Sequence, residues 1–160
     1  MQAIWPYLTD LHASLPAPAA YPALILVSAV CGILAGLERE SRDKPAGLRT
    51  IMLICVGSTI FTLASILMAG GHEFADRGRV AANIVTGIGF LGAGAIIREQ
   101  GAVLGLTTAA TIWTVAAIGL LVGTGYAAAG LALTLFIVIT VTVLRRFERP
   151  RKNWSGSPGV

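Results

Sequence analysis

Five apolar stretches follow one another along the chain, separated by short segments that carry most of the charged residues. The hydrocarbon core of a bilayer is about 30 Å thick, and a helix of roughly 20 residues crosses it. The pattern therefore predicts an all-α integral membrane protein, a bundle of five transmembrane helices. The expected spans are Tyr21–Leu37, Arg49–Ala69, Arg79–Arg98, Val103–Val122 and Tyr126–Leu144.

Composition supports a membrane environment over an aqueous one. Hydrophobic residues make up 55% of the 160 residues, and charged residues make up 12%. Soluble domains carry roughly 25% charged residues. The mean hydropathy of +0.76 points the same way. We expect a single membrane domain over residues 21–144.

The two ends of the chain differ in composition from this domain. Residues 1–20 contain several prolines, lack a basic start and place Ile4, Leu8 and Leu11 on one helical face. This pattern predicts an amphipathic helix in the membrane interface, which stays on the mature protein. An unstructured lead-in is the alternative. Residues 145–160 are basic and rich in Pro, Gly and Ser, which predicts a disordered tail.

The positive charges are unevenly distributed between the predicted loops. Ten of the twelve Lys and Arg residues fall in segments that five spans would place on one side of the membrane, and Arg77 and Arg79 fall on the other. Cytoplasmic loops carry the excess of Lys and Arg, so we expect the N-terminus outside and the C-terminus in the cytoplasm. Topology also accounts for the net charge of +4. Nucleic-acid binding is not indicated, because aromatic residues are not interleaved with the basic ones.

The third stretch, Arg79–Arg98, contains four glycines: Gly87, Gly89, Gly92 and Gly94. Small residues let helix backbones approach closely, so we expect this helix at the centre of the bundle. A broken helix that exposes its backbone to a substrate or ion is the alternative. The first three glycines match the dinucleotide-binding pattern GxGxxG, but that pattern needs a soluble strand–turn–helix context.

One polar stripe enters this glycine-rich stretch. Asp76, Arg79 and Asn83 share a helical face if the helix begins early. Polar side chains are costly against lipid, so the stripe should face protein or water. Asn83 could form an interhelical hydrogen bond that only joins helices, or it could contact a partner or ligand. The candidate binding residues are Asn83, Asp76, Arg79, Gly87, Gly89, Gly92 and, in the fourth stretch, Trp113.

A second polar group lies at the predicted cytoplasmic end of the first two spans. It consists of Glu38, Arg39, Glu40 and Arg42, with Arg49 beside them at the start of the second span. We interpret it as ion pairs that close the helix ends. The alternative is a cluster that keeps two helices in register or binds a partner.

Catalytic, metal and cofactor sites are not indicated. His12 and His72 lie outside the spans, and no serine has a nucleophile-elbow pattern. Glu73 and Asp76 could attract a divalent cation, but Arg77 and Arg79 lie beside them. Cys31 and Cys55 lie within apolar stretches and suit buried small hydrophobes, with a functional thiol pair as the alternative.

Three segments carry a family resemblance: GLERE to KPAGLRT at 36–50, RVAANIVTGIGFLGAGAII at 79–97 and GLTTAATIWTVAAIG at 105–119. They resemble the MgtC/SapB family of membrane proteins over residues 25–145. The resemblance implies a five-span domain in the bacterial inner membrane. The best-known family members are linked to survival inside macrophages and to growth in low magnesium. They are thought to bind and restrain the F-type ATP synthase membrane sector. Asn83 falls where the family has a polar amide.

Three functional hypotheses follow. The first is a membrane regulator that binds a partner within the bilayer, such as the F-type ATP synthase membrane sector. The second is a transporter or channel for a cation such as Mg²⁺, with Asn83, Asp76 and unwound glycine backbone supplying oxygen ligands. The third is a self-associating protein whose glycine faces form a homodimer seam.

Overall fold

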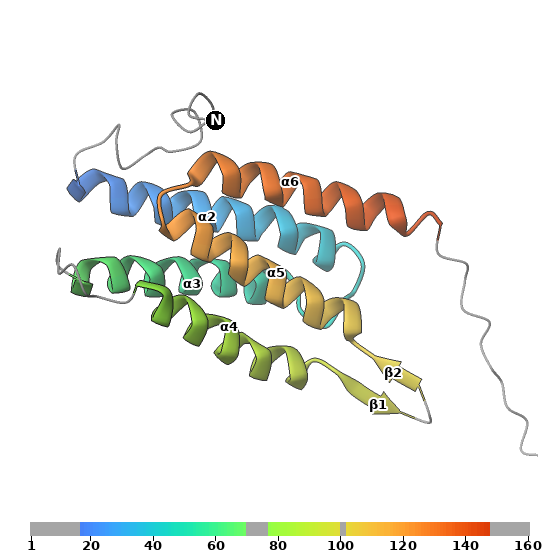
Figure 1. Cartoon of the computed structure of the whole chain (residues 1–160). Helices are drawn as coiled ribbons and strands as arrows, with labels where there is room; N and C mark the ends of the chain where they lie inside the picture. The colour runs from blue at the N-terminus through green and yellow to red at the C-terminus, as the bar shows by residue number, and fades with distance from the viewer. Residues whose placement is uncertain (1–16, 70–76, 100–101, 148–160) are drawn as a thin grey trace, which may run out of the picture.

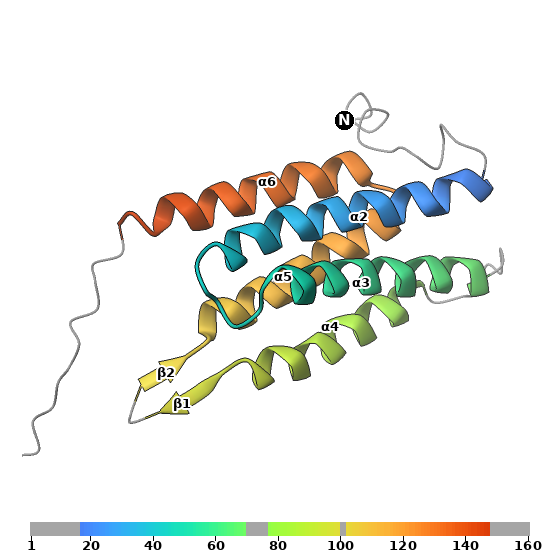
Figure 2. The same cartoon turned by 180° about the vertical axis from the view of Figure 1, so that it is seen from behind.

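The computed structural model describes residues 17–69, 77–99 and 102–147. Within these ranges the chain forms five helices and a two-stranded antiparallel hairpin, and the helices lie side by side in a bundle (Figure 1, Figure 2). The elements are α2 (Ala17–Glu40), α3 (Leu48–Ala69), α4 (Arg77–Gly94), β1 (Ile97–Glu99), β2 (Ala102–Leu104), α5 (Leu106–Gly123) and α6 (Ala127–Leu144).

The predicted all-α architecture is confirmed, and the membrane character is supported. Four helices, α2, α3, α5 and α6, are long and apolar enough to cross a bilayer. Helix α4 is as long as α5 and α6 but is not among these four, since it carries two arginines, Asn83 and five glycines. A multi-pass membrane protein is thus supported. A count of five spans and the orientation of the termini stay predictions.

The third predicted span ends earlier than the sequence suggested. Helix α4 stops at Gly94, and Ile97–Glu99 pairs with Ala102–Leu104 in a hairpin, where the sequence predicted the end of the third span and the start of the fourth. Isoleucine and valine side chains at 96, 97 and 103 favour extended backbone. Gly105 has a φ of 86° before α5. A Cβ at this position would lie 1.9 Å from the Ala95 carbonyl oxygen, so only glycine fits the base of the hairpin.

The predicted end segments fall largely outside the described residues. These are residues 1–16 of the interfacial lead-in and residues 148–160 of the basic tail. Helix α2 begins at Ala17, within the last part of the predicted lead-in.

Helices α3 and α5 cross closely. A Cβ on Gly119 would lie 2.2 Å from the Cys55 carbonyl oxygen, and one on Gly123 would lie 2.6 Å from the Thr62 Cβ. The Thr59 hydroxyl is 2.7 Å from the Gly119 carbonyl oxygen and 3.1 Å from that of Cys55, so it can donate across the crossing. Glycines four residues apart allow this approach.

A second glycine pair joins α2 to α3. A Cβ on Gly32 would lie 2.6 Å from the Met52 Cα, and one on Gly36 would lie 2.8 Å from the Leu48 Cα. Helices α2, α3 and α5 therefore form a compact block, and Cys31 and Cys55 are buried in it as free thiols.

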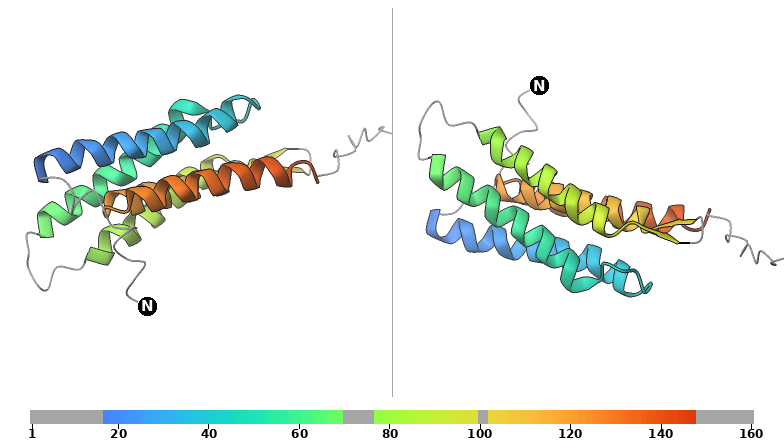
Figure 3. Two further views of the ribbon diagram at one scale, coloured as in Figure 1. Left: turned by 90° about the horizontal axis from the view of Figure 1, so that it is seen from above. Right: turned by 90° about the horizontal axis from the view of Figure 1, so that it is seen from below.

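The prediction that the glycine-rich helix is central is wrong. Helix α4 lies at the edge of the bundle against α5 and, less extensively, α3 (Figure 3). A Cβ on Gly87, Gly89 or Gly94 would meet no heavy atom within 4 Å, and one on Gly92 would meet only Ala109, at 3.7 Å. Glycine permits a close helix contact but does not create one. The facing helix decides which glycines are used.

This difference gives a stability test. We expect Gly119→Ala to lower the midpoint of thermal unfolding in mild detergent, because the methyl group overlaps the α3 backbone. Overpacking of this kind costs roughly 1–3 kcal/mol. Gly89→Ala is the matched control and should leave the midpoint unchanged or slightly higher, since it meets open space and favours helix. Equal losses for both variants would contradict the packing described above.

Candidate functional site: a groove between α3 and α4

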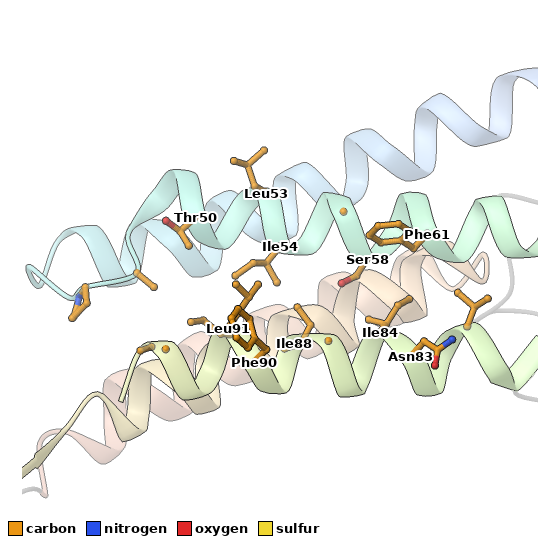
Figure 4. Close-up of a pocket in the computed structure, with 18 residues that line it drawn as sticks. Thr50, Leu53, Ile54, Ser58, Phe61, Asn83, Ile84, Ile88, Phe90 and Leu91 are labelled. Atoms are coloured by element: carbon orange, nitrogen blue, oxygen red, sulfur yellow. The ribbon is translucent and has the colours of Figure 1, made fainter. Parts of the chain in front are cut away.

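A groove of about 1110 Å³ runs between α3 and α4 (Figure 4). It extends from Pro45 and Ala46, before α3, to Phe61 and Val80. Ile112 of α5 lines it from between the two helices. The remaining lining residues are Thr50, Leu53, Ile54, Gly57 and Ser58 of α3, Asn83, Ile84, Gly87, Ile88, Phe90, Leu91 and Gly94 of α4, and Ala95.

Three glycines keep this groove open. Gly57 lines it from α3, Gly87 and Gly94 line it from α4, and a Cβ on any of them would meet nothing within 4 Å. Side chains on both sides of them, such as Ile54 and Leu91, point toward the space between the helices (Figure 4). The groove therefore exists because the walls lack side chains where two packed helices would otherwise interlock.

The groove is almost entirely apolar. Among the described residues, its polar side chains are Thr50, Ser58 and Asn83, and no charged residue of those ranges lines it. Asn83 is exposed, and its amide can both donate and accept hydrogen bonds. Such a surface suits an apolar occupant with one hydrogen-bonding group.

The structure separates the residues that the sequence grouped together. Asn83, Gly87 and Gly94 line the groove. Gly89 and Arg79 are exposed on α4 but do not line it, and Gly92 packs on Ala109. Trp113 is 54% exposed on α5 and also lies outside it. Asp76 lies outside the described residues.

Sequence reasoning missed the α3 wall. Its chief members are Gly57, Ser58 and Phe61. A single glycine in the middle of an otherwise apolar helix was the available signal, since glycine there lowers helix stability and needs a packing or functional reason.

The polar cluster at the end of α2 holds four helices together. Glu38 forms an ion pair of 2.8 Å with Arg42, and Arg42 also donates to the Thr142 hydroxyl of α6 at 3.2 Å. Glu40 accepts the Leu48 backbone N–H at 2.9 Å, which caps the start of α3. Both carboxylates therefore have partners other than Arg39.

Arg39 is the one charged residue buried in the described part of the chain, with 2% of its surface exposed. It donates from Nη2 to the Thr108 hydroxyl in the first turn of α5. Its Nε has no partner among the described residues. Arg49, by contrast, is exposed. The cluster thus contains one ion pair, one helix cap and one buried arginine that fixes α5 to α2.

Metal coordination has no structural support in the described ranges. They contain no group of three or more His, Cys, Asp and Glu side chains that could hold a metal ion. Residues Glu73 and Asp76 fall outside those ranges.

Comparison with known proteins defines the family. The family model described as the MgtC family matches residues 25–150. This chain belongs to the MgtC family. Among MgtC-family relatives, "Putative magnesium transporter YhiD" of Escherichia coli K12 is 39% identical over 138 residues, covering 82% of this chain and 64% of that protein.

Two further relatives carry the name "Protein MgtC". That of Salmonella typhimurium LT2 is 45% identical over 121 residues, covering 76% of this chain and 51% of the relative. That of Brucella abortus 2308 is 45% identical over 129 residues, covering 80% of this chain and 53% of the relative. The chain thus spans about half to two thirds of the length of these curated relatives. No solved structure gives a significant match.

The contribution of the Arg39–Thr108 hydrogen bond to stability can be tested by substitution. Thr108→Val keeps the shape of the side chain but removes the hydroxyl that accepts from Arg39. A hydrogen bond to a charged group contributes roughly 1.5–3 kcal/mol, so the unfolding midpoint in detergent should fall clearly. Thr107→Val alters an exposed neighbour on the same turn and should have little effect. A neutral Thr108→Val variant would contradict this role for Arg39.

Proposed function

We propose that this MgtC-family protein is a regulator in the bacterial inner membrane that binds a membrane-spanning helix of a partner protein in the groove between α3 and α4. The observation that carries the proposal is the open, glycine-walled groove beside the exposed Asn83 amide. Helix α4 carries little side-chain surface, so it gains few contacts with lipid. A partner helix would provide those contacts.

The shape and chemistry of the groove favour a helix as the occupant. A protein segment within the hydrocarbon must satisfy its own backbone hydrogen bonds, as a helix does. The groove runs along two helices, and its glycines permit close backbone approach. Asn83 can then bond to one polar side chain of the partner, which would fix the register of the helix.

The family resemblance suggests the partner and its context. We propose the membrane sector of the F-type ATP synthase, with a role in adaptation to low magnesium. The uneven Lys and Arg distribution supports an N-terminus outside the cell and a C-terminus in the cytoplasm.

Cation transport is the second candidate, favoured by the name of the Escherichia coli relative. Mg²⁺ prefers oxygen ligands, usually including carboxylates, and keeps several water molecules. In the part of the chain that the structure describes, the groove offers three polar side chains and no carboxylate. This lining favours a helix over a hydrated cation.

The binding proposal predicts a position-specific effect on α4. We expect Gly87→Leu, which fills the groove, to weaken binding of the purified ATP synthase membrane sector in co-reconstituted liposomes by about tenfold or more, a change of at least ~1.4 kcal/mol. Gly89→Leu is the matched control, because Gly89 is equally open but lies outside the groove. Its binding should match that of the unaltered protein.

Three results would change this conclusion. Equal loss in both variants would indicate a nonspecific effect on α4. Dimers that survive detergent and separate on Gly89→Leu would favour a homodimer seam. No measurable binding by the unaltered protein would exclude this partner.

The transport alternative has its own measurement. The purified protein in sealed liposomes should give no Mg²⁺ uptake above that of protein-free liposomes, recorded with an internal magnesium-sensitive dye. Uptake that disappears on Asn83→Leu would overturn the regulator proposal in favour of transport.

A further inference from the structure

The hairpin formed by β1 and β2 presents apolar side chains that nothing in the described chain covers. Ile97 is 57% exposed and Leu104 is 44% exposed. The two residues are paired directly across the strands, so they share one face. Ile96 and Leu106, at the base of the hairpin, are also exposed.

The hairpin also lacks support from other strands in the described part of the structure. Each strand has three residues, and the sheet contains only these two strands. An isolated two-stranded hairpin is marginally stable in water. At its base, Gly105 packs against the Ala95 carbonyl, which brings together the two chain segments that lead to α4 and α5. A hairpin with an uncovered apolar face needs a surface to lie against.

The depth of the hairpin in the membrane identifies the surface against which it lies. Helix α5 has 18 residues, and this length rises about 27 Å, which nearly spans the ~30 Å hydrocarbon core. The hairpin therefore begins where the hydrocarbon ends. It lies at the same end of the bundle as the α2–α3 connection and the last turn of α6 (Figure 1, Figure 2). The exposed basic residues of this end are Lys44, Arg49, Arg98, Arg145 and Arg146.

We propose that the hairpin is an interfacial anchor that inserts its Ile97–Leu104 face among the upper acyl chains of the bilayer. Arg98, next to Ile97, is then level with the phosphates of anionic lipids, whose charge complements this basic end. The outer edges of the two strands have backbone groups that need hydrogen-bond partners. Interfacial water supplies these, so the hairpin stays at the boundary and does not enter the core.

This anchor has a consequence for α4. The hairpin connects α4 directly to α5, and Gly94 and Ala95 at its base line the groove. Lipid contact at the hairpin therefore holds that end of α4 in place. The anchor is independent of any partner in the groove, so it can be tested separately from the proposed function.

The experiment measures the depth of single labels in the full chain. Ile97→Cys and Leu104→Cys are each labelled with a fluorophore, while Cys31 and Cys55, at most 1% exposed, remain unlabelled. Lys44→Cys, an exposed position at the same end, is the matched control. The proteins are reconstituted in phosphatidylglycerol-containing liposomes with acyl chains brominated near the headgroup. We expect quenching by these lipids to be severalfold greater at 97 and 104 than at 44, and quenching by aqueous iodide to show the reverse.

Two outcomes would overturn the anchor. Iodide quenching at 97 and 104 equal to that at 44 would place the hairpin in water. Weak quenching by both agents would mean that protein covers the face, either a second copy or another chain. Since a label could disturb the hairpin, the unaltered protein is also treated with a lipid-soluble diazirine. Photolabelling should reach Ile97 and Leu104, and its absence there would equally contradict the proposal.

Discussion

The close crossing of α3 and α5 determines the rest of the architecture. Within a bilayer, helices gain little from hydrophobic burial, so close packing and interhelical hydrogen bonds must hold them together. Gly119 and Gly123 bring α5 onto the α3 backbone, where the Thr59 hydroxyl can donate to the Gly119 carbonyl oxygen at 2.7 Å. Gly32 and Gly36 bring α2 onto a neighbouring face of α3. With these faces of α3 occupied, α4 packs at the edge.

Glycine has two opposite roles in this fold. In the block of α2, α3 and α5 it removes a side chain so that another backbone can take its place. In α4, and at Gly57 of α3, it removes a side chain and leaves the space empty. The groove is the result of this second role. It places Asn83 beside an apolar space, on a helix poorly suited to face lipid on its own.

The sequence determined the helices well, because long apolar stretches bounded by charges allow few alternatives in a membrane. It did not determine their arrangement. The number of glycines suggested that α4 is central, whereas the spacing of Gly119 and Gly123 marked the contacting helix and was not used. Arg39 was placed among ion pairs, yet it extends to Thr108 of α5 while Glu38 and Glu40 bond elsewhere. Long-range contacts of this kind have no local pattern. The α3 wall was missed although Gly57 gave a local signal, because no pattern in the sequence placed α3 opposite α4.

The account depends most on α4 lying at the edge with its groove face uncovered in the isolated protein. Spin labels placed singly along residues 82–94 of the reconstituted protein measure this directly, through their mobility and their accessibility to oxygen in the lipid phase. The account predicts a helical period, with mobile, accessible labels at 83, 87 and 90 and an immobile, protected label at 92. Uniformly immobile and inaccessible labels would show that α4 is enclosed by other helices, which would contradict both the edge position and the open groove.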